Sequence, residues 1–170
     1  SQQRKLVDRK VIRDAVNSVE PGLLAQASLD SIGLIWLKDS SKIPQVLSAL
    51  RSKFTEAAIH KIYAGEDLAL ILDPKDPRTP DIIVQPMPGA FYVENVDSPA
   101  SQALLAEHGG MLDEDVHVPL VVSVPGAQSK RVLSPVLTSQ IAPTVLKSLG
   151  LNPQTLKAVQ IENTPLLPGF

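Results

Sequence analysis

The 170-residue sequence contains no cysteine, few aromatic residues, no long run of one charge and no long apolar run. Without cysteine, thiolate catalysis, cysteine-bound zinc and disulfide bonds are excluded, while both reducing and oxidising compartments stay open. Aromatic residues make up only 4% of the chain, so aliphatic side chains must fill the core. The net charge is −2, and no cluster of like charges gives the electrostatic footprint that nucleic acid or an anionic membrane surface requires.

Several sequence signatures are also missing. No stretch of about 18 apolar residues occurs, and the first ten residues lack a secretory-signal pattern, so we expect no membrane segment. The serine-nucleophile patterns GxSxG and SxxK and the phosphate loops GxGxxG and GxxxxGK[ST] are absent. No catalytic nucleophile is therefore predicted from motifs.

What is present is an alternation of apolar patterns in a chain that is 44% apolar. Three- and four-residue spacing predicts helices over Gln2–Val19, over Ile43–Lys53 and from Thr138 or Ser139 to Leu149. Short apolar runs predict strands at Ser31–Lys38, Ile59–Tyr63, Asp81–Gln85, Ala90–Glu94 and Val118–Val124. The proline-rich segment Asp73–Pro80 is predicted to be a loop, and the tail after Asn152 to run off through two prolines. Together these patterns predict one α/β domain over residues 1–170, layered, with a mainly parallel sheet flanked by helices.

The segment from Ala106 to Gly126 holds most of the residues that can carry chemistry. His108 is preceded by Glu107, which can orient its ring, and followed by Gly109 and Gly110, which permit positive φ and a close approach to a ligand. His117 stands at the start of the predicted strand. The spacing matches neither a helical HExxH pair nor a calcium-binding EF-hand loop. From the residue types alone, this segment is either a metal or phosphate site or a solvated acidic turn at Asp113–Asp115.

Five segments, taken in order, resemble a known family. They are RTPDIIVQPMPGAFY at 78–92, AEHGG at 106–110, HVPLVVSVPG at 117–126, SQIAPTVLKSLGL at 139–151 and TPLLPGF at 164–170. This order is similar to the C-terminal part of alkaline-phosphatase-superfamily proteins, above all the type I phosphodiesterase and nucleotide pyrophosphatase branch. The resemblance implies an α/β fold like the C-terminal half of an alkaline phosphatase. It also implies a hydrolase of phosphate esters that uses two divalent metals, usually zinc.

The resemblance places His108 at the family's late histidine metal ligand. It leaves Glu107, Gly109 and His117 as candidate second-shell or pocket residues, with a structural role for His117 the more frequent outcome. The family's nucleophile and its other metal ligands lie before the matched region. Because a catalytic zinc typically needs three protein ligands, we expect the chain alone to be inactive and to take up metal only with the missing half present.

Three relationships to the family stay open: a fragment of a longer hydrolase, one half that associates with its partner, or a stand-alone derivative with a binding role. The first two make the missing N-terminal half the partner and a phosphate ester the substrate. The third predicts self-association or another protein partner, through an exposed proline-rich tail and apolar surface. Many family members work outside the cytoplasm, so the resemblance favours an extracellular or periplasmic location.

Overall fold

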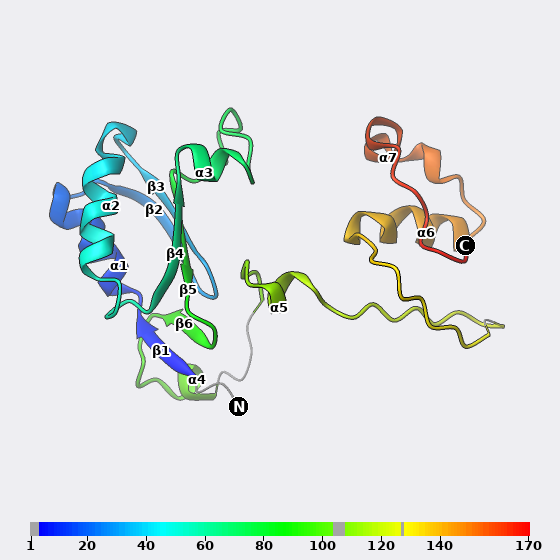
Figure 1. Ribbon diagram of the computed structural model, residues 1–170, viewed down its shortest axis with the longest axis horizontal. Helices are drawn as coiled ribbons and strands as arrows, with labels where there is room; N and C mark the ends of the chain where they lie inside the picture. Colours follow the sequence, from blue (N-terminus) through cyan, green and yellow to red (C-terminus); the bar gives the residue numbers. More distant parts are fainter. Residues whose placement is uncertain (1–3, 104–107, 127) are drawn as a thin grey trace. The chain divides into compact units, whose positions relative to one another are not determined.

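The computed structural model describes residues 4–103, 108–126 and 128–170, and it divides into two compact units, residues 1–120 and 121–170. In the first unit the strands are β1 (Lys5–Asp8), β2 (Leu24–Leu29), β3 (Gly33–Leu37), β4 (Ile59–Ala64), β5 (Ile82–Pro86) and β6 (Ala90–Val93). Its helices are α1 (Lys10–Val19), α2 (Ile43–Ser52), α3 (Glu66–Ala69), α4 (Pro99–Ala103) and α5 (Asp113–Val116) (Figure 1). The second unit contains α6 (Ile141–Ser148) and α7 (Lys157–Glu162).

The first unit is an α/β structure with two sheets. Four strands form an antiparallel sheet in the order β2-β3-β5-β4, and β1 pairs with β6 in a small parallel sheet. The α/β class is therefore as predicted, whereas the prediction of a mainly parallel sheet is wrong. One cause is local: only three residues connect β2 to β3, and so short a connection can only join antiparallel strands.

The helices α1 and α2 lie side by side on one face of the antiparallel sheet, here called the inner face (Figure 1). Alternate residues of the strands join the apolar side of each helix there, and the cluster includes Ile12, Val16, Ile35, Leu37, Val46, Leu50, Ile82 and Val84. Burying each large aliphatic side chain contributes roughly 1.5–3 kcal/mol. The inner face is thus the main core of the first unit.

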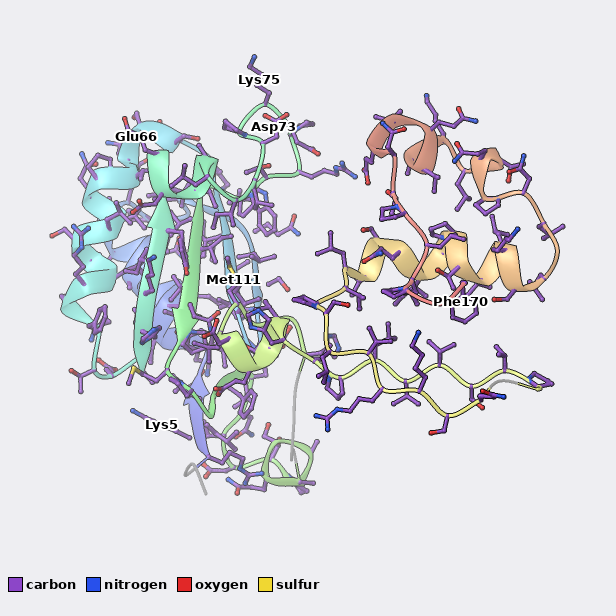
Figure 2. The ribbon with its side chains drawn as sticks, turned by 45° about the vertical axis from the view of Figure 1, so that its right-hand side comes forward. Lys5, Glu66, Asp73, Lys75, Met111 and Phe170 are labelled. Carbon is purple, nitrogen blue, oxygen red and sulfur yellow. The ribbon has the colours of Figure 1, made fainter. Side chains whose placement is uncertain are left out.

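Cover on the opposite face of the sheet, here called the outer face, explains why every residue of β5 is buried. Ile83 and Gln85 alternate with the core residues Ile82 and Val84 and so point outward, yet they are only 3% and 2% exposed. The backbone of Met111 lies against this face, where its N–H donates to the side-chain oxygen of Gln85 at 2.8 Å (Figure 2). The burial of β5 on both faces therefore comes from helices on one side and from the Met111 segment on the other.

The predicted helix over Gln2–Val19 begins only at Lys10. Residues 5–8 form β1, whose register pairs Lys5 with Ala90 and Asp8 with Val93. The apolar residues Leu6 and Val7 fit helical spacing equally well. Pairing with β6, which is distant in sequence, selects the strand.

Tyr92 on β6 connects the small sheet to the rest of the first unit. Its side chain is 1% exposed, its hydroxyl donates to the carbonyl of Ala57 at 3.0 Å, and its backbone N–H donates to Asp30. Burial raises the pKa of the Tyr92 hydroxyl well above its ordinary value of 10.0, because the phenolate would lose its hydration.

This raised pKa predicts a loss of stability in alkali. Below pH 10 Tyr92 is protonated in both folded and unfolded chains, so the free energy of unfolding is unaffected by its titration. Above pH 10 the unfolded chain ionises while the folded chain does not, so stability falls as pH rises. Urea unfolding of the wild type, of Tyr92→Phe and of Tyr63→Phe at pH 8 and pH 11 tests this expectation.

Tyr92→Phe should cost about 1 kcal/mol at pH 8, through the lost hydrogen bond, and should show a smaller alkaline loss than the wild type. The matched variant Tyr63→Phe, at the other tyrosine, should keep the full loss. Equal alkaline losses in all three proteins would contradict the assignment to Tyr92.

The second unit is organised by two buried polar side chains near the start of α6. Gln140 accepts from the N–H of Leu137 at 2.7 Å and donates to the carbonyl of Leu166 at 3.0 Å. The Thr144 hydroxyl donates to Gln140 at 2.7 Å and accepts from the N–H of Leu167 at 2.8 Å. Leu167 is only 6% exposed. The tail that was predicted to run off therefore folds back onto α6 and is anchored there.

The predicted strand Val118–Val124 is not a strand in the structure. Residues 118–124 have no strand assignment, and Val118 and Val121 are 61% and 87% exposed. A two-sided apolar strand needs paired neighbours and cover on both faces, and the described residues supply neither to this segment. Among the helices in the described part of the chain, none is long and apolar enough to cross a membrane.

Candidate functional site

The segment His108–Met111 is held on the outer face of the antiparallel sheet at two points. The hydroxyl of Ser31, in the turn between β2 and β3, donates to the carbonyl oxygen of His108. Three residues later, the N–H of Met111 donates to the side-chain oxygen of Gln85 on β5 at 2.8 Å. The backbone that carries His108 is therefore fixed to the scaffold at both ends, and His108 itself is exposed.

Gln85 is the buried centre of this attachment. While its oxygen receives Met111, its amide nitrogen donates to the carbonyls of Pro86 at 3.1 Å and Ser31 at 3.5 Å. One side chain thus connects β5, the β2–β3 turn and the His108 segment. Ser31 is also buried, at 7% exposure, so both attachments are shielded from competing water.

Positions 109 and 110, which follow His108, are occupied by glycine for different structural reasons. Gly109 has φ +95°, a left-handed conformation that other residues adopt only with strain, which confirms the prediction of positive φ there. Gly110 does not have positive φ, but a Cβ built on it would overlap the carboxylate of Asp115. A larger residue at position 110 would require the Asp115 carboxylate to shift.

The predicted acidic turn Asp113–Asp115 is the first turn of α5. Asp115 accepts from the N–H of Leu112 at 3.2 Å, while the Asp113 side chain is 99% exposed. Carboxylates in the first turn of a helix are favoured because they face its unpaired N–H groups. The arrangement is that of a solvated helix start that also packs against Gly110.

His117 ends α5 and contacts its own helix. Its Nδ1 lies 3.1 Å from the carbonyl oxygen and 3.7 Å from the carboxylate of Asp113, and its side chain is 78% exposed. This geometry supports the structural alternative for His117. Glu107, the other residue predicted to support His108, lies outside the described residues.

A zinc site needs more ligands than this segment supplies. Among residues 4–103, 108–126 and 128–170, no three His, Asp or Glu side chains are grouped so that they could hold one ion. His108 has a suitable donor, but a catalytic zinc needs about three such protein ligands. The described residues alone therefore do not fit a catalytic metal.

Ser31 and Gln85 were not predicted as site residues. A signal for Gln85 exists in the sequence, because it is the one polar residue in the run IIVQP and is followed by a glycine-containing turn. A polar side chain in a buried strand needs partners, but its partner Met111 is 26 residues away. Ser31 gives no such signal, since a serine beside an aspartate is ordinary in a hairpin turn.

Comparison with known proteins gives no match to this chain from any protein-family model, curated protein or solved structure.

Proposed function

We propose that this chain is the C-terminal portion of a metal-dependent phosphoric ester hydrolase of the phosphodiesterase or phosphatase type. In this proposal the chain contributes His108 as one metal ligand, together with part of the pocket wall. The observation that carries the proposal is the attachment of the His108 segment: Ser31 and Gln85 fix its backbone while the imidazole stays exposed. A backbone fixed at two points suits a metal ligand, because preorganisation limits the entropy lost on binding.

The family in this proposal is the alkaline phosphatase superfamily. It comes from the resemblance of the segments between residues 78 and 170, taken in their order along the chain. In this interpretation the first unit and the segments after it form the C-terminal half of an alkaline-phosphatase-like fold. The nucleophile and the remaining ligands belong to an N-terminal half, and the protein that contains both halves is called the complete protein below. When bound, the metals would polarise the phosphoryl oxygens and activate the nucleophile. The 170-residue chain by itself is expected to be inactive.

Metal uptake tests the proposal directly. After dialysis against zinc and removal of excess metal, the 170-residue chain should retain much less than one equivalent, because it offers one recognisable ligand. The complete protein should retain about two equivalents, as expected for two-metal hydrolases. Metal analysis by plasma mass spectrometry gives both numbers. Stoichiometric zinc on the 170-residue chain, or a complete protein that binds none, would contradict the proposal.

A second candidate is a non-catalytic binding or interaction module derived from the same fold. The observation that favours it is the set of exposed large apolar side chains in the second unit, which includes Val121, Leu133 and Leu137. Exposed apolar patches of this kind mark protein interfaces. The intact mass of the natural protein separates the candidates: a mass well above 18.3 kDa supports the hydrolase, and an equal mass supports the module. The module further predicts an oligomer or a stable complex by light scattering.

A further inference from the structure

Lys61 on the edge strand β4 is held in place without a carboxylate partner. Its ammonium nitrogen lies 4.4 Å from the centre of the Tyr63 ring, a cation–π contact, and the residue is exposed. In the part of the chain that the structure describes, no Asp or Glu forms a salt bridge with it. A cation that is ordered by an aromatic ring, and not neutralised, is available to an anion from solution.

The strand register places Lys61 next to the His108 segment. Lys61 is directly opposite Gln85, and Gln85 accepts the N–H of Met111. Side chains that face each other in antiparallel strands have Cβ atoms about 4.5–5.5 Å apart, so Lys61 and the Met111 attachment share one region of the outer face. Lys61 and His108 are therefore presented on the same side of the sheet.

An apolar surface continues from Lys61 across this face. Tyr63 is opposite Ile83, which is opposite Leu34 on the next strand, and Trp36 follows Leu34 on the same side of β3. Tyr63, Leu34 and Trp36 are half-buried, and Ile83 is buried. The indole N–H of Trp36 donates to the carbonyl of Arg78 at 3.2 Å, which fixes that ring. We call Leu34, Lys61 and Tyr63 the aromatic platform, and Trp36 lies beyond it, further from Lys61 along β3.

We propose that the aromatic platform is a subsite for an aromatic anion, namely the aryl leaving group of a phosphoester. The planar ring would lie on the apolar side chains, and Lys61 would contact the negatively charged phosphoryl oxygens that the ring carries. The assignment to a leaving group rests on the proposed function, because it assumes that the ester is cleaved beside His108. Binding of the aromatic anion itself does not depend on cleavage.

The features of the platform select this ligand over others. A bare inorganic anion would use Lys61 and leave the aromatic and aliphatic surface uncovered, and a neutral aromatic compound would leave Lys61 unused. A polyanion such as nucleic acid needs a basic surface, and the platform offers one lysine in a chain of net charge −2. One cation beside a flat apolar surface matches one ring with one anionic group.

The test is a nuclear magnetic resonance titration of the 170-residue chain with phenyl phosphate, without metal. Saturable shifts are expected at Lys61, Tyr63 and Leu34, with tighter binding than for inorganic phosphate or phenol. Lys61→Met should weaken binding by about threefold to fivefold, the range of an exposed ion pair. Lys10→Met, which removes an exposed lysine of α1 on the opposite face of the sheet, is the matched control and should leave the affinity unchanged.

Absence of saturable shifts, equal binding of inorganic phosphate, or equal affinities of the wild type and Lys61→Met would each overturn the subsite. Shifts caused by a single-stranded oligonucleotide but not by phenyl phosphate would overturn it in favour of nucleic-acid binding. Thermal unfolding followed by circular dichroism verifies that both variants are folded. Because no metal or turnover is involved, a negative result here leaves the role of His108 untouched. Conversely, failure of the metal-uptake test of the proposed function would leave the titration result standing.

Discussion

Replacing His108 with alanine in the complete protein is expected to reduce phosphoester hydrolysis by at least about a hundredfold. The imidazole is proposed as a direct metal ligand, and its loss should both weaken zinc binding and disturb the geometry of the in-line displacement. The exposed position of His108 means that the substitution leaves the core intact. Initial rates with an aryl phosphodiester, together with zinc content, measure the effect.

His117→Ala provides the matched control, because it removes a second exposed histidine nine residues later in the same loop region. In the described part of the chain, the polar contacts of the His117 ring are to Asp113 of its own helix, so activity should stay within about twofold of the wild type. Unchanged hydrolysis in His108→Ala would reject the proposed ligand. Equal losses in both variants would mean that the region is needed for folding or assembly, and not that His108 has a specific role.

The second large effect is expected from Gln85→Leu, measured on the 170-residue chain. Leucine has a similar volume but accepts no hydrogen bond, so the N–H of Met111 loses its partner at the buried outer face. The carbonyls of Ser31 and Pro86 lose a donor as well. Leaving buried polar groups unsatisfied costs about 1–3 kcal/mol, and we expect a loss in that range in urea unfolding.

The same variant should also loosen the His108 segment more than the sheet. In hydrogen exchange, the amide of Met111 should lose protection, while amides of the core strands change only by the global loss of stability. Gln26→Leu is the matched control, because Gln26 lies on the exposed surface of β2 and should change stability by less than about 0.5 kcal/mol. If Met111 kept its protection in Gln85→Leu, the attachment would not depend on this side chain.

Much of the local structure could be predicted from sequence periodicity. The helix predicted at Ile43–Lys53 is α2, and the strands predicted near Ser31–Lys38, Ile59–Tyr63 and Asp81–Gln85 are β3, β4 and β5. In each of these segments the apolar pattern and the flanking polar residues agree, so local preference and burial favour the same structure. The strand β2 was missed, because Leu24–Leu29 has a weak pattern and gains its place by pairing with β3.

The wrong predictions of secondary structure share a different cause. Residues 5–8 and 118–124 have apolar patterns that fit more than one structure, and the outcome depends on whether a distant strand is available to pair. For residues 5–8 that strand is β6, whereas the described residues give residues 118–124 no ladder partner. The prediction of a mainly parallel sheet rested on the alternation of strands and helices along the chain. It failed because the missed strand β2 is joined to β3 by only three residues, which requires antiparallel pairing.

For the candidate site, the sequence by itself predicted His108 as the donor group, and it predicted the positive φ that Gly109 adopts. It also determined what is missing, since no nucleophile motif and no cysteine are present. Only the tertiary structure decided that Ser31 and Gln85 fix the His108 backbone and that Lys61 and Tyr63 share its side of the sheet. These contacts join residues from 26 to 77 positions apart in the chain. Hydrogen bonds and strand register over such separations follow from the packed fold, which local sequence patterns do not encode.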